Sequence, residues 1–142
     1  MRSIGSGHHL ASKRLILTLA LFSLPTIASA ACLASSPPAF TTAQAERGRR
    51  AYDARCASCH GTALEGGAAT PLKGAPFTLK WRGKSVQEMT DYIRDLMPQD
   101  DPGSLSPETA ADLTALVLSF NKIKPGAEVL PSKGQSPEVC IF

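Results

Sequence analysis

The amino-acid sequence predicts an all-α fold of three to four helices joined by long loops. Three segments combine apolar residues at helical spacing with side chains that cap helices, and no stretch alternates apolar and polar residues over the length of a strand. Glycine and proline are concentrated between these segments, which is typical of loops. The pattern predicts one small domain without internal repeats.

The first helix is expected over residues 43–55. Thr41 or Thr42 would cap it, and Gln44 follows Thr41 at the spacing of a capping box, in which each side chain bonds the backbone N–H of the other residue. Glycines and prolines then recur through residues 61–84. We expect this segment to be a loop that wraps around another group and contains no packed helix or strand.

A second helix begins at the capping box formed by Ser85 and Glu88. It is expected to end near Met97, because Pro98 disfavours helical geometry at the residue before it and favours extended backbone there. The apolar stripe of this helix consists of Met89, Ile93 and Leu96. Met97 is therefore predicted to lie off this stripe.

A third helix follows Ser106, which suits the N-cap, and Pro107, which is tolerated at the first helical position. Its apolar face consists of Leu113, Leu116, Val117 and Phe120. We assign residues 41–122 to the domain, and residues 123–142, which are rich in proline and glycine, to a C-terminal tail.

The first thirty residues have the features of a secretory signal. Basic residues precede an apolar stretch at 15–24, and the small residues 28–30 match a cleavage site before Ala31. A retained membrane anchor is the alternative, but this apolar run is much shorter than the roughly 20 residues of a spanning helix. We predict an exported, periplasmic protein without stable membrane insertion after cleavage, and an N-terminal extension over residues 31–40.

A lipoprotein signal is a second alternative, because Cys32 lies just after the predicted cleavage site. A large aliphatic residue usually stands three positions before a lipid-modified cysteine, and Ser29 occupies that place. Lipidation is the minor hypothesis, and a mass spectrum of the mature N-terminus distinguishes the two.

The charge of the chain gives no indication of a nucleic-acid partner. The formal net charge is +3, from 15 Lys and Arg against 12 Asp and Glu. Because the predicted signal holds Arg2, Lys13 and Arg14 and no acidic residue, the positive and negative charges of the mature chain are equal in number. We therefore predict no binding to nucleic acid.

Cys56, Cys59 and His60 form a C-x-x-C-H motif, which is the motif for covalent haem attachment. The two thiols can add to the two vinyl groups of a haem, and the histidine binds the iron as an axial ligand. A zinc site would need two further ligands, but the mature chain has no other histidine and its remaining cysteines lie at its two ends. A thioredoxin-like pair would need a βαβ context, and a disulfide loop would give His60 no role. The motif predicts one covalently attached haem c.

The second axial ligand is predicted by elimination. Since His60 is the only histidine of the mature chain, the natural partner is a methionine sulfur, either from Met89 or from Met97. Met89 lies on the apolar stripe of its helix, where methionine usually fills a core. Met97 lies at the helix end on extended backbone, and we favour it as the ligand. With both axial positions filled, the iron is suited to electron transfer rather than to binding small molecules.

The chain resembles the class I c-type cytochromes, and particularly the single-haem cytochromes and cytochrome domains that serve periplasmic dehydrogenases. The resemblance covers residues 43 to 121. It rests on the haem motif followed by Gly61, and on Gln44, Ala45, Gly48, Tyr52, Leu72-Lys73-Gly74, Phe77, Trp81, Met97-Pro98, Pro102 to Ser106 and Leu118 to Asn121. It implies a cytochrome c fold in which the loops wrap one haem.

The resemblance also implies roles for residues of the first helix. Gly48 would let this helix cross closely against the last helix near Leu116 and Phe120, with Tyr52 at the same crossing. The alternative is a tolerated glycine on an exposed face.

Further roles around the haem follow from the resemblance. A backbone carbonyl before Leu72, from Thr70 or Pro71, would accept a hydrogen bond from His60, and the choice stays open because Thr70 stands where the family often has proline. Trp81 would direct its indole N–H towards a haem propionate. Arg82 would pair with a propionate or remain a solvated loop residue.

Cys32 and Cys140 lie outside the family pattern, one near each end of the mature chain. In an oxidising compartment we predict a disulfide between them that ties back the C-terminal tail, in preference to free or intermolecular thiols.

The function predicted is that of a soluble electron carrier, not an enzyme. Its partners would be redox proteins such as a periplasmic dehydrogenase or oxidase, met by a monomer in transient complexes. The alternatives are a haem enzyme or ligand sensor with an open iron site, and a docked cytochrome subunit of a larger oxidoreductase complex.

Overall fold

The computed structural model describes residues 40–132 and 140–141, and its regular structure is helical, which confirms the all-α class. The predicted signal and Cys32 lie outside the described residues. Within the described part the helices are α1 (Thr42–Arg55), α2 (Ala57–His60), α3 (Gly74–Trp81), α4 (Val86–Leu96) and α5 (Pro107–Phe120). None of these helices is both long enough and apolar enough to cross a bilayer.

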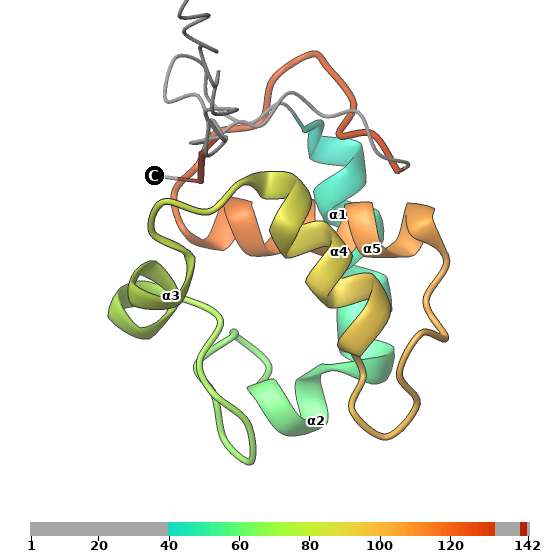
Figure 1. Ribbon diagram of the computed structural model, residues 1–142. Coiled ribbons are helices and arrows are strands. Elements are labelled where there is room, and N and C mark those ends of the chain that lie inside the picture. Colours follow the sequence, from blue (N-terminus) through green and yellow to red (C-terminus); the bar gives the residue numbers. More distant parts are fainter. Residues whose placement is uncertain (1–39, 133–139, 142) are drawn as a thin grey trace, which may run out of the picture.

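The helices pack around two contacts. Helices α1 and α5 cross each other, and α4 packs on α5, while α2 continues directly from the end of α1 (Figure 1). Helix α3 lies at the edge of the molecule (Figure 1). The core between these helices consists mainly of Phe40, Tyr52, Leu64, Phe77, Trp81, Val86, Met89, Leu113, Leu116, Val117 and Leu118.

The crossing of α1 and α5 depends on Gly48. A Cβ atom at this position would overlap the backbone carbonyl of Asp112 and would lie 3.0 Å from the Cβ of Leu116. Arg47, the preceding residue, donates from Nε and Nη2 to the two carboxylate oxygens of Asp112, each at 2.7 Å. The prediction that Gly48 permits a close crossing near Leu116 is confirmed.

Tyr52 and Phe120 flank the same crossing. The Tyr52 side chain is buried, and the guanidinium of Arg49 lies 5.4 Å from the centre of its ring and 5.0 Å from that of Phe120. Phe120 itself is partly exposed, whereas Leu113 and Leu116 on the same predicted face are buried.

The predicted helix starts are confirmed. Thr41 caps α1 in a capping box with Gln44, Ser85 caps α4 in the same way with Glu88, and Ser106 caps α5. Met97 has φ −122° and ψ 150°, so it is extended and lies just beyond α4, as Pro98 predicted.

The prediction that residues 61–84 contain no helix is wrong for residues 74–81, which form α3, and three to four helices was too low a count. Gly74 and Pro76 suggested a loop, but both lie in the first turn of α3, where proline is tolerated because its N–H would have no partner within the helix. Phe77 and Trp81, one turn apart, are buried and hold α3 to the core.

The C-terminal tail packs back onto the domain. Gln44 exchanges two hydrogen bonds with the backbone of Leu130, donating to its carbonyl at 2.9 Å and accepting from its N–H at 2.8 Å. Ile141 is buried and donates its N–H to the carbonyl of Lys84 at 3.1 Å, and Cys140 forms an isolated β-bridge with Ser85. The tail therefore contacts the beginnings of both α1 and α4.

The crossing predicts that Gly48→Ala destabilises the protein. Helix propensity alone would favour alanine by about 1 kcal/mol, but the added methyl overlaps the Asp112 backbone. We expect the free energy of unfolding to fall by about 1 to 3 kcal/mol, the usual range for overpacking. Urea denaturation followed by circular dichroism measures the change.

Gly126→Ala is the matched control, because a Cβ at Gly126 meets no atom within 4 Å. We expect its free energy of unfolding to stay within about 0.5 kcal/mol of the unmodified protein. A Gly48→Ala variant that is as stable as this control, or more stable, would contradict the close crossing.

Candidate haem-attachment site

The C-x-x-C-H segment begins where α1 ends. Cys56 closes α1 by donating its N–H to the Tyr52 carbonyl at 2.8 Å, and its own carbonyl accepts from the N–H groups of Cys59 and His60 at 3.2 and 2.9 Å. These bonds make α2 a single helical turn, which separates the two cysteines by about one turn. Both thiols are free.

The two thiols differ in environment. Cys59 is exposed, whereas Cys56 is partly buried and packs against the core. Burial raises the pKa of the Cys56 thiol above its usual value, although the nearby Arg55 acts in the opposite direction. Nucleophilic cysteines of thioredoxin-like pairs have lowered pKa values, so the raised pKa disfavours that alternative.

His60 is oriented by a backbone carbonyl. Its Nδ1 lies 2.8 Å from the carbonyl oxygen of Thr70. A carbonyl can only accept, so Nδ1 carries the proton and Nε2 keeps its lone pair. Of the two acceptors that the sequence left open, the hydrogen bond is made by Thr70 rather than Pro71.

Thr70 reaches His60 because the loop after α2 folds back on that helix. Ala69 donates its N–H to the Cys59 carbonyl at 2.9 Å, and Gly66 donates to the His60 carbonyl at 2.7 Å. Gly61, with φ +78°, begins this return, and a Cβ there would lie 2.5 Å from the Glu65 carboxylate. Glycine is therefore required directly after the motif.

Two side chains outside the loop hold it in place. Tyr52 donates its hydroxyl to the Gly61 carbonyl at 2.6 Å. Asn121, just after α5, donates to the Leu72 carbonyl at 2.9 Å and accepts from the Gly74 N–H at 3.1 Å. Asn121 belongs to the family pattern, but no role was predicted for it from the sequence.

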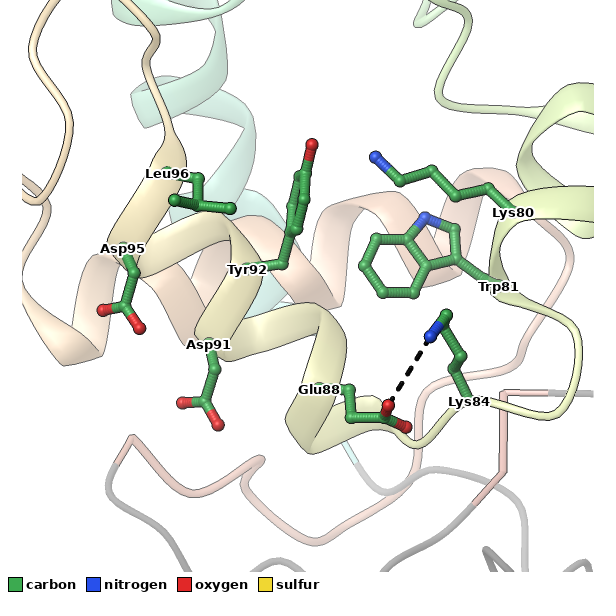
Figure 2. Close-up of a pocket in the computed structure, with 8 residues that line it drawn as sticks. All are labelled: Lys80, Trp81, Lys84, Glu88, Asp91, Tyr92, Asp95 and Leu96. Atoms are coloured by element: carbon green, nitrogen blue, oxygen red, sulfur yellow. Dashed lines mark ion pairs between the residues drawn. The ribbon is translucent and has the colours of Figure 1, made fainter.

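A cavity of about 540 Å³ lies beside Trp81, between α3 and α4 (Figure 2). The Trp81 and Tyr92 rings meet edge to face at 5.6 Å between centres, and the Lys80 ammonium lies 3.9 Å from the centre of the Tyr92 ring. In Figure 2 the Tyr92 hydroxyl, the Trp81 indole nitrogen and the Lys80 ammonium point to the same side. The lining also includes Lys84, Leu96 and three acidic side chains, Glu88, Asp91 and Asp95, but no residue of the C-x-x-C-H motif.

Two residues that line the cavity, Lys80 and Tyr92, were not predicted from the sequence to belong to the site. Lys80 and Tyr92 line it together with Trp81, whereas Arg82 is exposed and is not among its lining residues. Tyr92 lies one turn before Leu96, which also lines the cavity, so the helical spacing of these two residues was the available signal.

The two candidate methionines have different surroundings. Met89 is only 1% exposed and belongs to the core, as expected for a residue on the apolar stripe of α4. Met97 is partly buried and lies in the connection between α4 and α5, with a cis peptide bond to Pro98.

These residues fit an attached haem. The two thiols are free and one turn apart, and the adjacent His60 has an Nε2 lone pair available for iron. Among residues 40–132 and 140–141, no group of three or more His, Cys, Asp and Glu side chains is arranged to hold a metal ion.

The buried hydroxyl of Tyr52 should make the free energy of unfolding decrease at alkaline pH. Burial raises the pKa of its hydroxyl to about 12 from the usual 10, so the folded state favours the protonated form. The contribution is complete below pH 10 and is lost as the pH rises from 10 towards 12, because the unfolded chain ionises first. Urea denaturation at a series of pH values measures this decline.

Tyr52→Phe should remove this part of the decline. The variant also loses the bond to Gly61, so we expect it to be less stable at pH 7 by about 0.5 to 1.5 kcal/mol. Tyr92→Phe is the control and should keep the decline. An unchanged alkaline decline in Tyr52→Phe would show that another group causes it.

The chain matches a family model and is similar to solved structures, and no curated protein matches it. The family model described as cytochrome c oxidase, cbb3-type, subunit III matches residues 43–117, which is more than half of the chain. The chain is also similar to a chain in the crystal structure of the sulfane dehydrogenase SoxCD from Paracoccus pantotrophus. The TM-score is 0.50 at 24% sequence identity, over 66% of this chain and 52% of the SoxCD chain.

At that identity the SoxCD likeness shows a common fold, and this protein corresponds to only about half of the SoxCD chain. The family match covers α1 to α4 and most of α5, with the haem motif and the loop that returns to His60. The protein therefore belongs to the c-type cytochrome family described as cytochrome c oxidase, cbb3-type, subunit III, and it is a haem protein of electron transfer.

Proposed function

We propose that the protein is a soluble periplasmic electron carrier with one haem c, attached covalently through Cys56 and Cys59. The observation that carries the proposal is the pair of free thiols one turn apart, directly followed by a histidine whose Nδ1 proton is already bound by Thr70. When bound, the haem supplies an iron that takes up and releases one electron at a time.

His60 and Met97 are the axial ligands in this proposal. The Thr70 carbonyl keeps the proton on Nδ1 of His60, orients the ring and increases its basicity. Met97 is favoured over Met89, because moving Met89 to the iron would remove a buried side chain from the core. A thioether and an imidazole together raise the reduction potential compared with more electron-donating ligands.

The cavity at α3 and α4 supports a site for the haem propionates. The Trp81 indole N–H, the Tyr92 hydroxyl and the Lys80 ammonium are all donors on one side of this cavity (Figure 2). A carboxylate there would accept from them, and the charges of Lys80 and Lys84 would have to offset its charge together with those of the lining residues Glu88, Asp91 and Asp95. Arg82 remains a second candidate, since it is exposed and follows Trp81 directly in the chain.

If His60 and Met97 both hold the iron, no position would be left for a small ligand, which favours electron transfer over catalysis at the haem. We therefore infer that the protein is not itself an enzyme. A haem enzyme or ligand sensor would instead have high-spin iron and would bind carbon monoxide or cyanide rapidly.

We propose a periplasmic dehydrogenase or an oxidase as the redox partner. A docked subunit of such a complex is the second candidate, and two findings favour it: the matching family is described by an oxidase subunit, and the similar fold occurs in a dehydrogenase. A free carrier purifies as a monomer, whereas a docked subunit copurifies with its complex.

The ligand assignment predicts a low-spin spectrum with a weak methionine-to-iron band at the red end when the protein is oxidised. Met97→Leu should abolish this band and should allow rapid binding of cyanide, because one axial position becomes open. Optical spectra of the oxidised holoprotein measure both effects.

Met89→Leu is the matched control, since it exchanges one apolar side chain for another of similar volume at a cost below about 1.5 kcal/mol. It should keep the red band. Loss of the band in Met89→Leu, with the band retained in Met97→Leu, would assign the ligand to Met89.

The proposal also includes a disulfide between Cys32 and Cys140, which on the chain-entropy model stabilises the protein by about 4 to 5 kcal/mol. In the described part of the chain the free thiols are those of the haem motif, and Cys140 is half-buried against Ser85. In the holoprotein, where the haem occupies Cys56 and Cys59, intact mass after alkylation should show two alkylated cysteines only after reduction. Two alkylated cysteines in the untreated protein would refute the bridge.

A further inference from the structure

Arg55 connects the haem motif to the segment that carries Met97. It is the last residue of α1 and directly precedes Cys56. Its Nη2 donates to Oδ2 of Asp101 at 3.1 Å and to Oγ of Ser104 at 2.9 Å. Both acceptors belong to the connection between α4 and α5, so one side chain ties this connection to the attachment segment.

Backbone hydrogen bonds within the connection between α4 and α5 link the residues that Arg55 binds to Pro98, the neighbour of Met97. Asp101 donates its N–H to the Pro98 carbonyl at 3.0 Å, and Ser104 donates to the Asp101 carbonyl at 3.4 Å. Pro98 directly follows Met97 in the chain. The Asp101 carboxylate held by Arg55 is therefore only one turn away from the proposed ligand.

We propose that Arg55 is a positioning residue for Met97: it holds the connection between α4 and α5 against the attachment segment and so keeps the methionine sulfur from exchanging with external ligands. This inference rests on the proposed ligation by His60 and Met97. Its hydrogen bonds are made to the turn that follows Met97 and not to a thiol or a methionine, so the proposed role differs from the charge effect of Arg55 on the Cys56 thiol.

The exposure of the Arg55–Asp101 ion pair limits how strongly it can hold the connection between α4 and α5. The Arg55 side chain is 38% exposed and that of Asp101 is 65% exposed, so the ion pair is screened by water and contributes little to global stability. It acts on a local equilibrium between bound and released Met97. An external ligand binds only the released form, so its apparent affinity rises in proportion to the population of that form.

Imidazole binding to the oxidised holoprotein tests the proposal, since an imidazole nitrogen replaces the Met97 sulfur and the red band disappears. In Arg55→Met we expect imidazole to bind about threefold to fivefold more tightly than in the unmodified protein. Asp101→Asn removes the other partner of the same ion pair without a change next to Cys56, and it should increase the imidazole affinity by a similar factor. The double variant should bind little more tightly than either single variant, because both remove one interaction.

Arg50→Met and Asp100→Asn are the charge-matched controls. Arg50 is exposed on α1 and Asp100 is exposed beside Asp101, and neither makes the contact between the two segments. Both controls should bind imidazole as the unmodified protein does. Covalent haem content, measured by mass, should be the same in all variants.

Three results would overturn the proposal. Unchanged imidazole affinity in both Arg55→Met and Asp101→Asn would remove the positioning role while leaving the ligand assignment intact. Equal increases in the controls would show that net charge, rather than this contact, sets the affinity. A red band that persists in Met97→Leu would instead refute the proposed ligation, and the role of Arg55 with it.

Discussion

The close contact of α1 with α5 at Gly48 is the constraint on which the site depends. Because the backbone of α1 touches the Asp112 carbonyl, the axes of the two helices approach more closely than side chains would allow. The two hydrogen bonds from Arg47 to the Asp112 carboxylate also hold α1 against α5 beside this contact. The C-terminal end of α1 delivers the haem motif, and the C-terminal end of α5 delivers Asn121. One crossing therefore sets the separation of the attachment segment from the loop that orients His60.

Most contacts around His60 are made by backbone groups, which explains why the loop tolerates departures from the family sequence. The family often has proline where this chain has Thr70, yet the group that binds the histidine is a carbonyl, which every residue carries. The required side chains are those that shape the backbone, such as Gly61 with its positive φ and Tyr52 with its hydroxyl on the Gly61 carbonyl. The orientation of His60 thus depends on loop geometry more than on residue type.

The parts of the fold that could be predicted from sequence are those governed by local interactions. The capping residues Thr41 and Ser85 act within one turn, and the effect of Pro98 on Met97 is a contact between neighbours. The role of Gly48 was predicted through the family pattern, because a glycine inside a helix does not by itself distinguish a close helix crossing from a tolerated exposed position. The C-x-x-C-H motif was specific enough to indicate haem by itself.

The remaining features depend on tertiary structure. Helix α3 was missed because glycine and proline break most helices, and only their position in the first turn makes them harmless. Lys80 and Tyr92 come together at the cavity from two helices, and no local pattern places an ammonium over that ring (Figure 2). The contact of Arg55 with Asp101 joins residues that are far apart in the chain, so no sequence spacing could indicate it.

The crossing at Gly48 also has a consequence for the order of folding. It joins the first long helix to the last, so its formation must close a loop that contains the haem motif, α3 and α4. A chain synthesised only as far as α4 leaves the Gly48 and Tyr52 face of α1 without its partner. The native position of the motif is therefore reached late, once α5 has been made.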